Sequence, residues 1–285
     1  MTRPADTETG SAAEPCERMH ILNGQLVAES QLLVSARDIG LLRGYGVFDF
    51  LITYHGGRPF HLADHVDRLY RSAATLHIDL PWPRSAVMDW TLSALAANGR
   101  QPAEHQIRIL ATGGVGPDAI TASTDRPTLI VFIDPHRPYP ARLYDEGAGV
   151  ITADYTRHWP AAKSLNYIEG VMRVAEARRR EAIEVVYHDG RRVFEGATSN
   201  IFALIDGRLC TPATQILAGI TRKVILNNLD LADRVQVVDF APTALRQATE
   251  VFLTASNKEI MPIVRIDDQV VGSGRVVDTL LIQCG

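Results

Sequence analysis

The sequence predicts an α+β fold built from two domains. Short apolar segments typical of strands and longer amphipathic segments typical of helices occur in both halves of the 285 residues, without an internal repeat. Between the halves, residues 134–140 (DPHRPYP) hold three prolines, which cannot donate to a sheet ladder and which restrict the residues before them. We therefore predict a disordered N-terminal tail over 1–18, an N-terminal α/β domain over 19–133, an interdomain linker over 134–140 and a C-terminal domain over 141–285.

Two β-hairpins are predicted in the N-terminal half. Residues 20–27 (HILNGQLV) place an Asn-Gly pair between two apolar runs, which is typical of a two-residue hairpin turn. Residues 46–60 (GVFDFLITYHGGRPF) run apolar on both sides of a Gly-Gly pair and indicate a second hairpin. Two further strands are expected over 105–112 (HQIRILAT) and 128–134 (TLIVFID).

Two helices are expected between these strands. Residues 61–78 carry apolar side chains at helical spacing, and the stripe consists of Leu62, Val66, Leu69, Ala73 and Leu76. Arg68 lies off that stripe. The second helix is predicted over 84–97, because the Asn-Gly pair that follows is a helix stop signal.

The C-terminal half is expected to begin with a strand over 147–157 (GAGVITADYTR), which leads into a loop that carries Lys163. A helix follows over 168–182 (IEGVMRVAEARRREA). Residues 184–212 then predict a β-meander, a run of successive paired strands with two Asp-Gly pairs at its turns.

Composition and charge exclude several classes of function. The net charge of −4 and the pI near 6.1 provide no basic surface, so nucleic acid is not an expected partner. The nine histidines show no ligand spacing with cysteines or acids, and no metal site is expected. Cys16, Cys210 and Cys284 lie far apart and are typical of reduced thiols. Neither a secretory signal nor a membrane span is indicated, and we predict a cytoplasmic protein without a membrane partner.

Lys163 is the first residue whose surroundings indicate chemistry. A lysine is ordinarily a solvated surface charge, but the segment HWPAAKSLNY surrounds this one with apolar and small side chains. An ammonium held there loses solvation, which favours the neutral amine, and a neutral amine is a nucleophile toward an aldehyde. The sequence therefore indicates imine chemistry at Lys163.

Two further segments fit the same chemistry. Glu195 ends a predicted strand in RRVFEGATSN, where a carboxylate could keep a pyridine nitrogen protonated; an ordinary exposed glutamate is the alternative. In LAGITRKVILNNL a glycine and a threonine open a helix. The free amides of Ile220 and Thr221, with the Thr221 hydroxyl, would form a phosphate cradle at its positive end. A plain N-cap is the alternative at this position.

Six motifs follow one another along the chain: RGYGVFD, HVDRL, KSLNY, EGATSN, LAGITR and TASNKEIMP. Their order resembles the class IV aminotransferases, the fold type IV group of pyridoxal phosphate enzymes, which includes branched-chain aminotransferases, D-amino-acid aminotransferases and aminodeoxychorismate lyase. The resemblance covers the chain from about Met19 to the C-terminus. It implies a smaller N-terminal α/β domain, a larger C-terminal pseudo-barrel domain and assembly as a homodimer.

The resemblance also implies roles for individual residues. Lys163 would be the Schiff-base lysine and the proton shuttle. Tyr167 would bind the phenolic oxygen of pyridoxal 5′-phosphate, and Glu195 would pair with the pyridinium of the same cofactor. The other cofactor-binding residues would be Arg68, Ile220, Thr221 and Ser256 at the phosphate, and Thr198 and Ala255 along the cavity. An amino acid and a 2-oxo acid would react in turn, in a ping-pong cycle.

Substrate choice depends on which arginine holds the carboxylate of the amino acid. Arg108 lies between two isoleucines on a predicted strand, so its side chain points opposite to both, either into a pocket or into solvent. It matches the arginine of the Tyr-x-Arg motif of the branched-chain enzymes, although Gln106 replaces the tyrosine. A Thr-Gly-Gly sequence replaces the Thr-Arg-Gly turn of the D-amino-acid enzymes. Arg43 could complete the clamp, and Phe48 is a further candidate for substrate binding.

The motifs KSLN and EGATSN are closer to the D-amino-acid group than to the EGxxEN form of the branched-chain enzymes. They favour a D-amino-acid aminotransferase with an altered carboxylate clamp. A branched-chain L-amino-acid aminotransferase is the first alternative and aminodeoxychorismate lyase the second. A non-catalytic protein that binds the cofactor on the same scaffold is the third.

Overall fold

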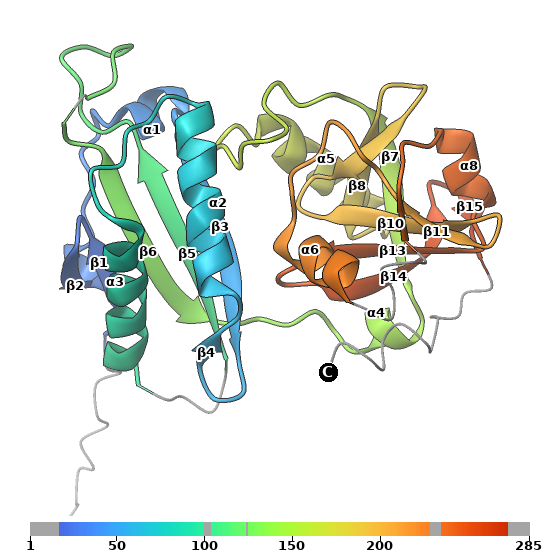
Figure 1. Cartoon of the computed structure of the whole chain (residues 1–285), viewed down its shortest axis with the longest axis horizontal. Helices are drawn as coiled ribbons and strands as arrows, with labels where there is room; N and C mark the ends of the chain where they lie inside the picture. The colour runs from blue at the N-terminus through green and yellow to red at the C-terminus, as the bar shows by residue number, and fades with distance from the viewer. Residues whose placement is uncertain (1–16, 100–103, 124, 229–234, 273–285) are drawn as a thin grey trace, which may run out of the picture.

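The computed structural model describes residues 17–99, 104–123, 125–228 and 235–272, which form two β-sheets with helices packed on them (Figure 1). In the N-terminal half, six strands make one antiparallel sheet in the order β2-β1-β6-β5-β3-β4. These strands are β1 (Met19–Leu22), β2 (Gln25–Ala28), β3 (Gly46–Tyr54), β4 (Arg58–Pro59), β5 (His105–Thr112) and β6 (Thr128–Pro135). The predicted α+β class is confirmed.

Both predicted hairpins of this half are confirmed, and left-handed backbone at their turns explains their sequences. The β1–β2 turn has φ angles of 51° at Asn23 and 84° at Gly24, where Asn and Gly are the least strained residues. The β3–β4 turn has positive φ at Gly56 and Gly57. Strands β5 and β6 have the positions predicted for them and pair along their whole length.

Helices α2 (Leu62–Thr75) and α3 (Arg84–Ala97) cover one face of this sheet (Figure 1). Helix α3 has the predicted bounds, because Pro83 is its N-cap and Asn98 its C-cap. Two shorter elements precede β3: the 3₁₀ helix η1 (Glu29–Gln31) and the helix α1 (Ile39–Arg43).

Helix α2 is buried on two sides rather than one. Val66 and Leu69 of the predicted apolar stripe are fully buried in the core of the N-terminal half. His65, Arg68 and Ser72 are buried as well, at spacings of three and four residues that place them on a second face. The sequence predicted only that Arg68 lies off the stripe; its side chain is removed from solvent and reaches the C-terminal half.

The C-terminal half contains a nine-stranded mixed sheet in the order β12-β11-β10-β13-β14-β7-β8-β9, with β15 paired to β14. Its strands are β7 (Ala148–Asp154), β8 (Glu184–His188), β9 (Val193–Gly196), β10 (Asn200–Ile205), β11 (Arg208–Thr211), β12 (Val235–Val237), β13 (Glu250–Ala255), β14 (Glu259–Ile266) and β15 (Gln269–Val270). Its helices are α4 (Arg142–Asp145), α5 (Ile168–Arg179), α6 (Ile220–Asn227) and α8 (Pro242–Gln247).

The continuous meander predicted over 184–212 was wrong at its centre. Strand β8 pairs with β9, and β10 pairs with β11, through the two Asp-Gly turns as expected. The other edge of β10 pairs with β13, and β9 meets β10 at a tight turn where the Gly196 N–H donates to the Ser199 carbonyl. Proximity in sequence favoured β9 as the partner of β10, but the distant strand β13 takes that edge. The sheet therefore curls into a half-barrel.

Residues 136–141 connect the first sheet to α4, because β6 ends at Pro135 and α4 begins at Arg142; the first two residues of the predicted linker belong to β6. The halves also contact each other away from this connection, since the Tyr54 hydroxyl donates to Glu259 at 3.0 Å. The division into two domains at these bounds stays a prediction.

The structure describes one of the three cysteines and little of the predicted N-terminal tail. Cys210 is a buried free thiol, whereas Cys16 and Cys284 lie outside the described residues, as does most of the tail predicted over 1–18. Within the described residues, none of the helices combines the length and apolar character that crossing a membrane requires.

Candidate active site

A cavity of about 390 Å³ lies between the two halves of the molecule. Its walls come from β3, α2 and β5 on one side, and from the turns after β9 and β13 and the start of α6 on the other. Eleven of the residues singled out from the sequence line it: Phe48, Arg68, Arg108, Lys163, Tyr167, Glu195, Thr198, Ile220, Thr221, Ala255 and Ser256. Segments far apart in the sequence therefore converge on one site.

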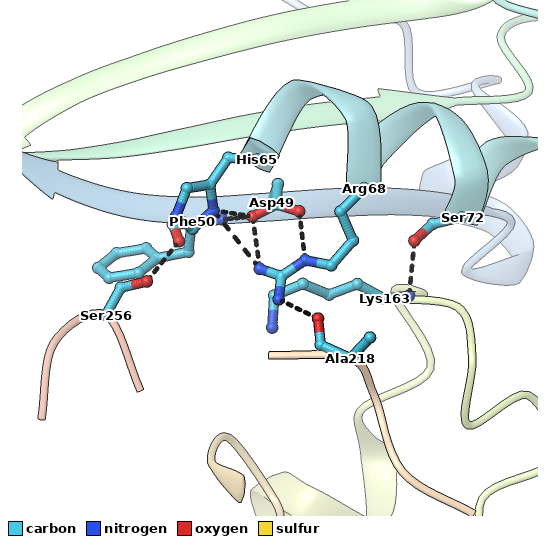
Figure 2. Close-up of polar contacts among 8 residues, drawn as sticks. All are labelled: Asp49, Phe50, His65, Arg68, Ser72, Lys163, Ala218 and Ser256. Carbon is cyan, nitrogen blue, oxygen red and sulfur yellow. Dashed lines mark hydrogen bonds and ion pairs between the residues drawn. The ribbon is translucent and has the colours of Figure 1, made fainter. Parts of the chain in front are cut away.

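The backbone of Lys163 is fixed by the N-terminal half. The Phe48 N–H donates to the Lys163 carbonyl (2.9 Å), and the Lys163 N–H donates to the Ser72 hydroxyl of α2 (3.0 Å). Figure 2 shows the side chain extending from the bond with Ser72 toward Arg68. Lys163 lines the cavity, and its Nζ lies 4.7 Å from the centre of the Phe48 ring. Within the described part of the chain this amine has no hydrogen bond or ion pair, so it is available to a ligand.

Arg68 is held by a buried acid. Asp49 of β3 accepts from its Nε at 2.9 Å and from its Nη2 at 2.8 Å, and the Nη1 donates to the Ala218 carbonyl at 3.1 Å (Figure 2). His65 contacts the same carboxylate through its Nδ1, at 2.6 Å. Although burial opposes ionisation, Arg68 and His65 hold the pKa of Asp49 far below its usual range. Asp49 and Ala218 take three of the five N–H groups, and the Nη2 also lies 3.5 Å from the His65 Nδ1, so at least one N–H remains for an anion.

Glu195 is a buried carboxylate with a cationic partner. Arg157 donates from its Nε to the Glu195 Oε1 at 3.0 Å, and its guanidinium lies 5.0 Å from the centre of the Tyr167 ring. The Leu217 N–H donates to the Glu195 Oε2 at 2.8 Å. Burial raises the pKa of Glu195, and Arg157 opposes that effect. The site thus holds a carboxylate whose ionisation depends on Arg157.

The segment before α6 is attached to both halves. Asn200 donates from its Nδ2 to the Leu217 carbonyl at 2.9 Å, while Arg68 holds the next carbonyl, that of Ala218. Gly219 is the N-cap of α6 and lies so close to Asn200 that a Cβ would meet the Asn200 Oδ1 at 1.9 Å. Helix α6 starts at Ile220, and its first N–H groups have no acceptor within the helix, so they can bind an anion.

The rest of the wall that comes from the C-terminal half is formed by two turns. The Ser256 hydroxyl donates to the Phe50 carbonyl of β3 at 3.1 Å, which ties the turn after β13 to the N-terminal half. Thr198, in the turn after β9, donates from its hydroxyl to the buried carboxylate of Glu184 at 2.6 Å. Both turns line the cavity, and the hydrogen of each of these hydroxyls is engaged by an acceptor within the protein.

The two arginines expected to clamp a carboxylate lie in different places. Arg108 lines the cavity and is exposed, with its guanidinium 5.8 Å from the centre of the Phe50 ring. Arg43 is the last residue of α1, donates to the carbonyl of its neighbour Leu42 at 2.8 Å, and is not among the lining residues. The structure therefore brings Arg108 to the site of this chain but not Arg43.

Sequence reasoning missed four residues that organise the site: Asp49, His65, Arg157 and Asn200. Asp49 did leave a signal, because a charged residue on the core side of an apolar strand needs a buried partner. Arg157 left none, since it lies in the loop after β7 and its partner Glu195, on β9, is 38 residues away.

These residues fit pyridoxal phosphate. The free amine of Lys163 suits an aldehyde, the buried carboxylate of Glu195 suits a ring nitrogen, and the N-terminus of α6 with Arg68 suits a phosphate. No group of His, Cys, Asp and Glu side chains within the described residues could hold a metal ion.

Comparisons with known proteins support the same assignment. The family model described as amino-transferase class IV matches residues 46–266. A putative branched-chain-amino-acid aminotransferase of Methanocaldococcus jannaschii is 35% identical over 266 residues, which is 90% of each chain. A D-alanine aminotransferase of Staphylococcus haemolyticus is 31% identical over 267 residues, covering 90% of this chain and 91% of that protein. The crystal structure of an Escherichia coli branched-chain amino acid aminotransferase superposes with a TM-score of 0.84 at 26% identity, covering 92% of this chain and 91% of that one.

Proposed function

Because the chain belongs to the class IV aminotransferases, and is therefore a pyridoxal-phosphate-dependent transaminase, we propose that it transfers the amino group of a D-amino acid to a 2-oxo acid. Arg108 is the observation that carries the substrate class. Its guanidinium lines the cavity and, among the described residues, contacts only the Phe50 ring. A cation held on a cavity wall without a carboxylate of its own suits the carboxylate of an amino acid.

Pyridoxal phosphate, when bound, supplies an aldehyde carbon that takes up the amino group and a ring that accepts electrons from the substrate Cα. Lys163 would hold the cofactor between turnovers, and its free amine would move the α-proton of the substrate. Glu195 would keep the ring nitrogen protonated, and Tyr167 would bind the phenolic oxygen. Arg68 and the first amides of α6 would bind the phosphate and so retain the cofactor when Lys163 is not attached to it.

The D configuration is supported by the motifs around the catalytic lysine and the buried acid. KSLN and EGATSN are closer to the D-amino-acid group than to the branched-chain form, and relatives named D-alanine aminotransferase match most of the chain. The test is a half-reaction without any oxo acid. The purified enzyme is mixed in turn with D-alanine, L-alanine, D-glutamate, L-glutamate and L-leucine, and the absorbance band of the bound cofactor is followed. We expect the band to be lost with the D-amino acids; loss with L-leucine alone would overturn the proposal.

A branched-chain L-amino acid is the second candidate for the donor. Arg108 occupies the position of the arginine in the Tyr-x-Arg motif, and the Methanocaldococcus jannaschii relative carries a branched-chain name. Loss of the band with L-leucine and not with D-alanine would establish this candidate. Aminodeoxychorismate lyase activity is distinguished from both transaminase activities by assaying the product, because the lyase releases pyruvate without net transfer of an amino group.

We also propose that the enzyme works as a homodimer. Leu33, Val34 and Val115 are exposed apolar side chains that together line a hollow on the N-terminal half. Exposed apolar groups that gather in one place are typical of a protein interface. Light scattering of the purified holoenzyme tests this, and a monomer mass at micromolar concentration would contradict it. Location in the cytoplasm stays a prediction.

A further inference from the structure

A buried lysine lies directly behind the cavity wall. Lys258 is 1% exposed, and its ammonium donates to the Thr198 hydroxyl at 2.7 Å and pairs with the Glu184 carboxylate at 3.2 Å. The same Glu184 oxygen accepts from the Thr198 hydroxyl at 2.6 Å and from the Thr198 N–H at 3.2 Å. Lys258, Thr198 and Glu184 therefore form a closed polar triad whose ion pair is removed from solvent.

This triad joins two turns that line the cavity. One turn, over 196–199, connects β9 to β10 and carries Thr198; the other, over 255–259, connects β13 to β14 and carries Lys258. Strands β10 and β13 pair up to Asn200 and Thr254, where their ladder ends. Beyond that point the triad continues the connection between the two turns.

Stability alone does not account for a lysine in this position. Burying an ammonium and a carboxylate costs several kcal/mol per ion, and a well-packed apolar pair of similar volume is often at least as stable. Burial lowers the pKa of Lys258, but the carboxylate of Glu184 at 3.2 Å more than offsets this, and the pKa of the ammonium is raised. The Tyr139 ring centre, 5.6 Å from the Lys258 Nζ, adds a third contact from the segment between the two sheets. What the triad provides is a fixed distance between the two turns, because Thr198 of one turn and Lys258 of the other meet at the carboxylate of Glu184 at the start of β8.

We propose that Lys258 is a positioning residue that holds the turn over 255–259 against the turn over 196–199, and so sets where Ser256 and Asn257 lie in the cavity. Both of these residues line it, and Ser256 is the residue to which a phosphate contact was assigned above. The inference rests on that assignment. Lys258 acts through the turn and does not itself touch the substrate.

The fold contains a second triad of the same composition that serves as an internal control, although its ion pair is more exposed, at 36% for Arg246 and 24% for Asp267. Arg246 of α8 pairs with Asp267 at 3.1 Å, and Thr152 of β7 donates to Asp267 from both its hydroxyl and its N–H, each at 2.8 Å. The composition is the same: a cation, a carboxylate and a threonine. None of these three residues is among those that line the cavity.

The experiment compares Lys258→Met with Arg246→Met by amide hydrogen exchange, by titration of the apoenzyme with pyridoxal phosphate, and by steady-state kinetics. For Lys258→Met we expect exchange about tenfold faster in both turns, and a cofactor Kd and an amino-donor KM about tenfold higher. The kcat at saturation should change less than about threefold, because no reacting group is removed. Arg246→Met should lose stability while both turns and the cofactor Kd stay as in the wild type.

A second variant removes the risk that Lys258→Met fails to fold with an unpaired Glu184 carboxylate. The double variant Glu184→Gln, Lys258→Met abolishes both charges, and we expect it to fold yet to keep the fast exchange over 255–259 and the weak cofactor binding. Wild-type exchange and Kd in this double variant would overturn the proposal, because Lys258 would then only neutralise Glu184. If the double variant exchanges fast over 255–259 but both it and Ser256→Ala bind the cofactor with the wild-type Kd, Lys258 still positions the turn. That result would overturn the phosphate contact of Ser256.

Discussion

The carboxylate of Asp49 lies behind Arg68 and takes two hydrogen bonds from its guanidinium, one from Nε and one from Nη2, with neither side chain more than about 6% exposed. Because the Nη1 also donates to the Ala218 carbonyl, the guanidinium is fixed across the gap between α2 and the start of α6. Arg68 is thus oriented before any phosphate arrives, so binding does not have to order it.

We predict that Asp49→Asn weakens cofactor binding and lowers stability. Removing one partner of a buried ion pair costs about 3–5 kcal/mol of unfolding free energy, because the other charge stays buried alone. The free energy comes from urea unfolding of the apoenzyme, and the cofactor Kd from titration. Asp67→Asn is the control. Asp67 lies on the exposed side of α2 and pairs with Arg84 of α3, so its substitution should lower the free energy of unfolding by under about 1 kcal/mol. Equal losses in the two variants would contradict the orientation argument.

Lys163→Ala is expected to remove the covalent attachment of the cofactor and to lower kcat by a factor on the order of 10⁴, because one amine serves as holder and proton carrier. The wild-type protein should be yellow, with a band that borohydride reduction fixes to the chain; the variant should release its cofactor on dialysis. A Lys163→Ala protein that keeps a borohydride-fixed band would place the attachment at another lysine.

Gly219→Ala should weaken phosphate binding without touching a ligand group. The added Cβ would lie 1.9 Å from the Asn200 Oδ1, so either Asn200 or the start of α6 must move. Overpacking of this kind costs about 1–3 kcal/mol in thermal or urea unfolding. Gly170→Ala in the first turn of α5 is the control, because its Cβ would meet only ordinary contacts at 3.4 Å or more. A wild-type cofactor Kd for Gly219→Ala would contradict the close packing described here.

Arg157→Met should shift the pH dependence of the reaction. Burial raises the pKa of Glu195 and Arg157 opposes that, so loss of the guanidinium raises this pKa further. Glu195 must be ionised to keep the ring nitrogen protonated, and activity is lost as pH falls through its pKa. The acid side of the kcat/KM profile should therefore move up by about 1–3 pH units. Arg173→Met, which removes an exposed ion pair on α5, should leave the profile unchanged.

Local sequence patterns predicted those parts of the fold that local physics decides. Helix α3 was predicted at its observed bounds because breakers flank it, and the β1–β2 hairpin because its Asn-Gly pair tolerates left-handed backbone. The partner of β10 was not predictable, since strand pairing between β10 and β13 joins residues about fifty positions apart. Neighbouring strands are only the more frequent partners.

The site residues, too, were predicted where local sequence is informative and missed where only the tertiary fold brings them together. Lys163 was predicted from its apolar neighbours and from the order of the motifs, and the cavity does contain it. The burial of Arg68 was not predicted, because a helical stripe counts apolar residues and ignores a buried polar face built around Asp49. The pairing of Arg157 with Glu195 depends on the tertiary fold alone.

Arg108→Met tests whether the cation on the cavity wall selects amino acids. We expect the KM for the amino-acid donor to rise about 10- to 100-fold, because a charge-assisted hydrogen bond to a carboxylate contributes about 1.5–3 kcal/mol. A plain amine has no carboxylate to lose, so its kcat/KM should change less than about threefold. Arg71→Met on the exposed side of α2 is the control for loss of a positive charge. If both donor classes lose activity equally, Arg108 supports the wall through its contact with Phe50 rather than binding the carboxylate.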